Sequence, residues 1–169
     1  MKFHSSLWRR LAVLAAGSSV LAGFPVEAHF YDIPEGESLT VSEPLTDVGG
    51  PDLVKQGDGT LILTGSSSYS GSTYLRAGTL SLTGTGAVIN HLTSPIHLAD
   101  GTFNVLNGAT LVTGEGMLAS SPDDQVSVLV DGANTSWSVY GNMRVGEAGS
   151  VLLEISGGAL LTTNGVVEL

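Results

Sequence analysis

The chain has 169 residues and no cysteine, and 16 Asp and Glu outnumber 6 Lys and Arg, for a formal net charge of −10. The lack of cysteine excludes disulfides, thiolate metal sites and cysteine nucleophiles, and the acidic balance argues against binding to a nucleic-acid backbone. With 23 Gly and 42% hydrophobic residues, the composition predicts a folded, glycine-rich module rather than a disordered linker.

Residues 1–28 have the organisation of a signal peptide for export. A basic start precedes an apolar stretch over residues 11–24, and small residues at Val26 and Ala28 match a signal-peptidase site. We predict cleavage after Ala28, which leaves a mature chain with 15 acids and 3 bases, net −12. The alternative is a membrane anchor, but the apolar stretch is shorter than the ~20 residues that a membrane span needs.

Residues 29–52 are rich in proline and acidic side chains. Prolines and charge repulsion weaken regular strand pairing. We therefore predict a loosely structured acidic lead-in or cap, with one strand at residues 38–42. The alternative is an acidic binding arm.

Residues 53–169 repeat one phrase: a glycine, a small residue, an apolar residue and then alternation. The phrase recurs at residues 59–63, 78–82, 101–105, 108–112 and 158–162. The first three of these glycines lie 19 and 23 residues apart, and a repeat near 20 residues is typical of a solenoid. Within a phrase the apolar side chains alternate, as at Leu80 and Leu82, which indicates half-buried strands. No helix is predicted after the signal.

Short strands at a fixed repeat can stack as the coils of a parallel β-helix. At roughly 22 residues per coil the mature chain would form about six coils and a rod about 30 Å long. Glycines would take the positive-φ corners, and Ser and Thr would line the solvent faces. A β-sandwich of hairpins is the alternative, because Asn-Gly and Asp-Gly pairs are present. Most of these pairs recur inside the repeated phrase, which favours the β-helix.

Within residues 53–82, Lys55 is followed by Gly-x-Gly-Thr-Leu-x-Leu-x-Gly, a Tyr-Ser-Gly-x-Thr turn and a second Gly-Thr-Leu strand that starts at Gly78. In order and spacing this segment resembles the autotransporter-associated β-strand repeat. Ser67 stands where the family usually has Asn, which would weaken a turn hydrogen bond, and Leu75 stands where Ile or Val is usual.

Residues 131–164 resemble a second repeat of this kind. The resemblance implies the passenger region of a Gram-negative autotransporter, a right-handed parallel β-helix that is exported through the inner membrane and displayed at, or released from, the outer surface. Such proteins end in a transmembrane β-barrel with aromatic girdles, whereas here no aromatic residue follows Tyr140. We therefore expect a passenger segment without its own barrel, with the export machinery and an outer-membrane barrel supplied elsewhere.

Candidate catalytic and metal-binding residues are few. His91 and His97 are separated by Pro95 and are expected in exposed loops rather than as a metal pair. Asp123 and Asp124 fall in a predicted turn that lacks the nonapeptide repeat of a calcium-binding β-roll. The serines at residues 66–68 lack a Gly-x-Ser-x-Gly elbow.

The large aromatic residues have three predicted environments. Trp137 lies on an alternating strand and is expected in the core or in a stack at a coil end. Tyr69 is expected to be exposed at a Ser/Gly turn. A sugar-binding platform that draws on these large aromatic residues, Trp137, Tyr140, Tyr69 and Tyr74, is the alternative.

These observations predict a protein that is not an enzyme, without catalytic, cofactor-binding or metal-binding residues. We expect a structural stalk or adhesin at the cell surface, in the outer membrane or secreted, or in the periplasm if no barrel is available. Its partners would be host surfaces, matrix or glycans, and open coil ends would favour self-association. The alternatives are a non-functional gene fragment and a polysaccharide-acting β-helix enzyme. The enzyme would need clustered charges, but Lys55, Arg76 and Arg144 are well separated in sequence.

Overall fold

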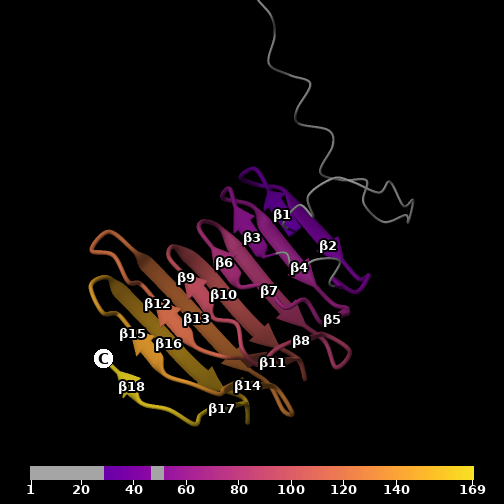
Figure 1. Ribbon diagram of the computed structural model, residues 1–169. Helices are drawn as coiled ribbons and strands as arrows, with labels where there is room; N and C mark the ends of the chain where they lie inside the picture. Colours follow the sequence, from indigo (N-terminus) through magenta and orange to yellow (C-terminus); the bar gives the residue numbers. More distant parts are fainter. Residues whose placement is uncertain (1–28, 47–51) are drawn as a thin grey trace, which may run out of the picture.

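The computed structural model describes residues 29–46 and 52–169 (Figure 1). The predicted signal peptide of residues 1–28 lies outside these ranges. All elements of the described ranges are strands, which confirms the prediction of an all-β fold there. None of the described residues forms a helix long and apolar enough to cross a membrane.

Three parallel sheets wrap around one core. Sheet 1 contains, in spatial order, β1 (His29–Asp32), β3 (Leu53–Gln56), β6 (Thr73–Leu75), β9 (Ile96–Leu98), β12 (Gly116–Leu118), β15 (Met143–Val145) and β18 (Val167–Glu168). Sheet 2 contains β2 (Ser38–Val41), β4 (Thr60–Leu63), β7 (Thr79–Thr83), β10 (Gly101–Leu106), β13 (Gln125–Asp131) and β16 (Ser150–Ser156). Sheet 3 contains β5 (Ser66–Ser67), β8 (Val88–His91), β11 (Thr110–Thr113), β14 (Ser136–Val139) and β17 (Leu160–Thr163).

From the second coil on, each full coil adds one strand to each sheet in turn, and successive strands of a sheet pair in parallel (Figure 1). The result is a parallel β-solenoid of about six coils, as the repeat length predicts. Parallel pairing throughout the described sheets excludes the sandwich of hairpins.

The core consists of ladders of inward side chains that repeat from coil to coil. In sheet 2 one ladder runs through Leu61, Leu80, Phe103 and Val128, which are all buried. Burying a side chain of this size contributes roughly 1.5–3 kcal/mol. Because side chains alternate along a strand, the same pairing sends the intervening Thr, Ser and Asn residues to the outer face.

The described part of residues 29–52 forms the first coil of the solenoid. Strand β1 pairs with β3, and β2, which matches the strand expected at residues 38–42, pairs with β4. Leu45 is buried and Thr46 bridges to Ser68. The expectation of loose structure is therefore wrong for residues 29–46, because Pro34 and Pro44 lie between the paired strands and interrupt none of them.

Glycines occupy the corners between sheets 1 and 2, as predicted. Gly57, Gly78 and Gly101 have φ values of 73°, 71° and 102° and lie above one another in successive coils. A Cβ atom at Gly78 or Gly101 would overlap the carbonyl oxygen of the glycine one coil earlier. Both the left-handed backbone and the close stacking of the coils therefore require glycine.

Candidate functional site

Several polar side chains are buried and hydrogen-bonded inside the solenoid. Lys55 is fully buried on β3, on the inward ladder that continues with Leu75 and Leu98 in the next two coils. Its Nζ donates hydrogen bonds to the carbonyl oxygens of Gln56, Gly57 and Ala77 at 2.9, 2.6 and 3.1 Å. The ammonium group thus joins the glycine corner of the second coil to the third coil.

Burial lowers the pKa of Lys55, and the nearby carboxylates of Asp32 and Asp58 oppose this effect. All three protons of an ammonium group can be donated, and three carbonyl acceptors use all of them. This is the arrangement of a structural clamp. The sequence does not show that Lys55 is buried, because a lysine is normally expected on the surface. The only signal is its position: Lys55 lies two residues after the buried Leu53, so both side chains of β3 point inward.

A second buried polar group lies where sheet 3 turns toward sheet 1. The Tyr69 hydroxyl is 2.6 Å from Thr73 Oγ1, which is 3.1 Å from Nε2 of His91. The other ring nitrogen of His91, Nδ1, is 3.0 Å from the carbonyl oxygen of Ser94. Burial raises the pKa of Tyr69 and lowers the pKa of His91.

Two expectations from the sequence are wrong at this corner. Tyr69 is not exposed at a turn but is 1% exposed, and its ring packs against those of His29 and His91. His91 is not in an exposed loop but ends β8 inside the core. Ser67 also lies in a strand, where its Oγ accepts a hydrogen bond from the Leu45 amide at 3.1 Å instead of serving a turn.

His97 lies on a different sheet from His91. It is on the outer face of β9, where its ring stacks on Tyr74 of β6 with centroids 4.7 Å apart and planes 4° apart. The Arg76 guanidinium lies 5.9 Å from the centroid of the Tyr74 ring. His91 therefore lies inside the solenoid and His97 lies on its outer face, so the two histidines do not form a metal-binding pair.

The remaining candidates have structural contacts. Trp137 is fully buried, as predicted, and its Nε1 donates to Thr113 Oγ1 at 3.1 Å. Asp124 closes the predicted turn by accepting a hydrogen bond from the Ser121 amide at 2.9 Å. In the described ranges no group of three or more His, Asp and Glu residues is placed to hold a metal ion.

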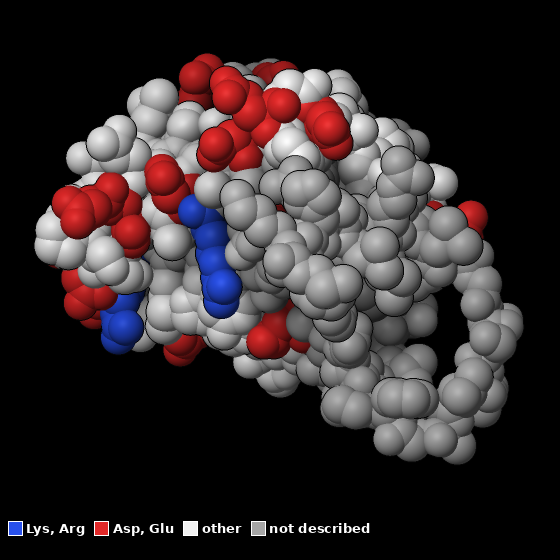
Figure 2. Space-filling model, turned by 90° about the horizontal axis from the view of Figure 1, so that it is seen from above, with Lys and Arg blue, Asp and Glu red and all other residues white. Residues whose placement is uncertain are grey.

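The exposed charge is mostly acidic. In Figure 2 the acidic side chains form several groups, whereas the basic ones form two separate patches. Of the three basic residues in the described ranges, Lys55 is buried and Arg144 pairs with Glu168 at 3.1 Å. The described residues therefore lack the clustered basic charge that a groove for acidic polysaccharides would need.

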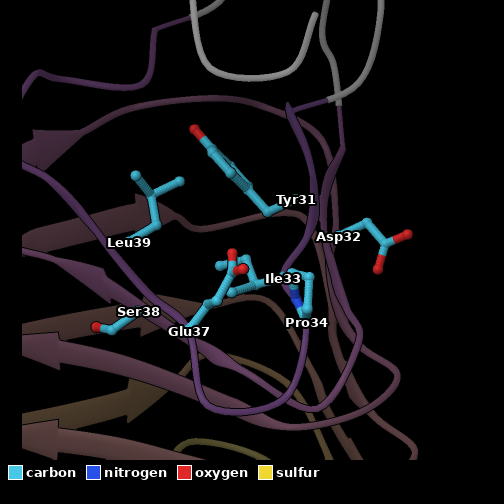
Figure 3. Close-up of a pocket in the computed structure, with 7 residues that line it drawn as sticks. All are labelled: Tyr31, Asp32, Ile33, Pro34, Glu37, Ser38 and Leu39. Atoms are coloured by element: carbon cyan, nitrogen blue, oxygen red, sulfur yellow. The ribbon is translucent and has the colours of Figure 1, made fainter. Parts of the chain in front are cut away.

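The described surface includes a pocket at the first coil and a wider groove on sheet 2. A pocket of about 150 Å³ lies at the first coil, where Tyr31, Ile33 and Leu39 point toward the same space and the carboxylate of Asp32 points away (Figure 3). A wider groove of about 480 Å³ runs across the outer face of sheet 2. It is lined by Asp100, Gly101, Thr102, Gln125, Val126, Ser127, Ser150, Val151 and Leu152.

Comparison with known families identifies one segment of the solenoid. Residues 53–82 match the Passenger-associated-transport-repeat family. The match starts at β3 and ends in β7, so it covers one complete coil and the beginning of the next, including Lys55 and Tyr69. No curated protein and no solved structure matches the chain. The chain thus carries an autotransporter passenger repeat within a β-solenoid, and this repeat implies export.

Proposed function

We propose that this solenoid is a surface-exposed structural stalk that also provides an adhesive contact. The observation that carries the proposal is the continuous register of the three sheets from β1 to β18. Stacked coils make a rod of fixed length without disulfides, and each coil adds about 4.8 Å. A rod of this kind sets the distance between a cell surface and whatever the rod contacts.

The groove on sheet 2 supports the adhesive part of the proposal. Thr102, Ser127 and Ser150 offer hydroxyl groups there, and the exposed side chain of Leu152 offers an apolar surface. Hydroxyl and amide groups beside an apolar patch suit a neutral polyol such as a glycan, which has hydroxyl groups and an apolar ring face. The contact would be weak for one rod and stronger for many rods on one surface.

Display can be tested by fusing the full chain to a heterologous outer-membrane translocator in a Gram-negative host. We expect a protein that is digested by protease added to intact cells and that is lost from the surface when Leu80→Asp disrupts the core. Ser127→Asp on the outer face is the matched control and should leave display unchanged. Retention of all of the wild-type protein inside the cell would contradict the stalk role.

Adhesion can be tested with the same cells on an array of neutral glycans and extracellular-matrix proteins. We expect binding that Ser127→Asp in the groove weakens and that Ser138→Asp on the outer face of sheet 3 leaves intact. Equal binding by all three proteins would reject the groove as the contact. Release of new reducing ends from any polysaccharide on the array would show an enzyme and overturn the proposal.

A further inference from the structure

The turn at residues 92–95 is held by both neighbouring coils. This turn joins β8 to β9 at the corner between sheets 3 and 1. The amide of Thr73, one coil earlier, donates to the Pro95 carbonyl at 3.1 Å, and the amide of Gly114, one coil later, donates to the Ser94 carbonyl at 2.9 Å. The Ser94 hydroxyl donates to the carbonyl of Ser70. The hydrogen bonds of this turn therefore connect three successive coils.

His91 is the side chain that links this turn to the interior. Because a carbonyl oxygen can only accept, the Nδ1 of His91 carries the proton donated to Ser94. In the neutral ring Nε2 is then an acceptor, so Thr73 donates to it and Tyr69 donates to Thr73. With a neutral His91 ring, the direction of each hydrogen bond from Tyr69 through Thr73 to His91 and Ser94 is therefore fixed.

Protonation of His91 would break this order. An added proton on Nε2 turns an acceptor into a donor, so the Thr73 hydroxyl could no longer donate to the ring. The Thr73 proton would then either point at the Tyr69 oxygen, in place of the hydrogen bond that Tyr69 donates, or be left without an acceptor in the core. The side chains of Tyr69 and His91 are almost fully buried. A charge on the buried His91 ring without a counter-ion is costly.

Among the described residues, no carboxylate contributes to the shift in the His91 pKa, which comes from burial and from backbone hydrogen bonds. Strands β5 and β11, which flank β8, consist of Ser, Thr, Leu and Val. The titratable group of β9 is His97, whose ring faces outward. Tyr69 contacts the imidazole directly, and His29 packs against the Tyr69 ring. Tyr31 and Asp52 act on the pKa of Tyr69, and the Asp52 carboxylate accepts a hydrogen bond from the Ser72 amide at 2.8 Å.

We propose that the hydrogen-bond chain from Tyr69 through Thr73 to His91 is an acid-sensitive latch for the turn at residues 92–95. While His91 is neutral, the latch holds this turn against the coils on either side. When His91 binds a proton the turn is released, and the second, third and fourth coils loosen at this corner. This inference is independent of the proposed stalk and adhesive role.

The direction of the pH effect follows from thermodynamic linkage. The native pKa of His91 lies below that of the unfolded chain because burial disfavours the charged ring. The stabilisation is therefore complete above the unfolded value of about 6.5 and is lost as the pH falls from there toward the native value. Each unit of difference between the two pKa values corresponds to roughly a tenfold change in the opening equilibrium.

The latch can be tested by amide hydrogen exchange on the full chain at pH 7.5 and pH 5. After correction for the intrinsic pH dependence of exchange, we expect the amides of Thr73 and Gly114 to lose protection at pH 5. The amide of Asn164, which donates to the Val139 carbonyl at the equivalent corner of the last coils, is the internal control and should keep its protection. Equal loss at all three amides would overturn the local latch.

Two variants separate His91 from the other histidines. His91→Gln keeps one donor and one acceptor but cannot be charged, so the loss of protection at pH 5 should disappear. His97→Gln removes an outer histidine and should behave like the unchanged chain. An unchanged acid response in His91→Gln would overturn the proposal.

If His91→Gln fails to fold, an NMR titration of the His91 ring in the unchanged chain decides the matter. Titration near pH 6.5 or above, with the amide of Gly114 still protected, would reject the latch. A ring that stays neutral until Gly114 loses protection would support it.

Discussion

The coils that carry the family match differ from the coils at the other end of the rod. The repeat coils, here residues 53–98, include the family match at residues 53–82 and bury polar side chains among the apolar ladders: Lys55, Ser67, Thr73 and His91. The later coils, residues 116–168, have large apolar side chains such as Trp137 and Met143 in the core. They also carry most of the exposed large hydrophobic residues, among them Leu152, Leu160 and Val167.

The difference shows two ways to hold the register of a parallel stack. A slip of one residue would send every apolar side chain to the outer face, so alternation alone prevents it. A slip of two residues keeps the alternation, and apolar ladders resist it only through side-chain volume. In the repeat coils the slip would also leave the Lys55 ammonium and the hydrogen bonds of His91 without partners, which costs much more.

The largest expected effect is in the later coils, where packing volume dominates. Trp137→Ala should lower the free energy of unfolding by about 4 kcal/mol, because it empties a large core volume and leaves Thr113 without the indole donor. Urea denaturation measures this loss. Tyr140→Ala is the control: its side chain is 54% exposed, and we expect a change within about 0.5 kcal/mol. Equal losses in the two variants would contradict the role of volume.

The second effect concerns the corner of the repeat coils. Gly78→Ala should cost about 3 kcal/mol, since the new Cβ meets the backbone of the preceding coil and the residue keeps a left-handed φ. Gly84 also has a positive φ, but nothing lies within 4 Å of its Cβ position. Gly84→Ala should therefore cost only about 1 kcal/mol. Thermal unfolding of both variants separates backbone strain from the close stacking of coils.

A third effect tests the buried ammonium group. Lys55→Met fills the ladder position with an apolar side chain but leaves three carbonyl groups without their donor, and we expect a loss of about 2 kcal/mol. Arg76→Met removes an exposed cation nearby and should change stability by less than about 0.5 kcal/mol. A Lys55→Met protein as stable as the original would mean that the apolar ladder alone holds this register.

The smallest effect lies on the outer face of the later coils. Leu160 is 58% exposed on β17, beside Ser136 of β14. Leu160→Thr should leave the free energy of unfolding within about 0.5 kcal/mol of the original. A loss greater than about 1 kcal/mol in urea denaturation would show that the outer face of sheet 3 contributes to folding after all.

Much of the solenoid could be predicted because its signals are local. The alternation at Leu80 and Leu82 predicts a strand, and the spacing of the glycines predicts the coil. The environment of Tyr69 could not be predicted, because Ser and Gly on both sides are typical of an exposed turn. The ring is buried because the fold brings His29 and His91, 40 and 22 residues away in sequence, into contact with it.

The sequence by itself determined the class of fold, the approximate length of the coil and the positions where glycine is needed, since these depend on periods of two and of about 22 residues. Only the tertiary structure decided which polar residues are inside. Lys55 and His91 satisfy their hydrogen bonds with groups of their own corner and of the neighbouring coils. Whether a polar side chain can be buried depends on partners that come together only when the coils stack.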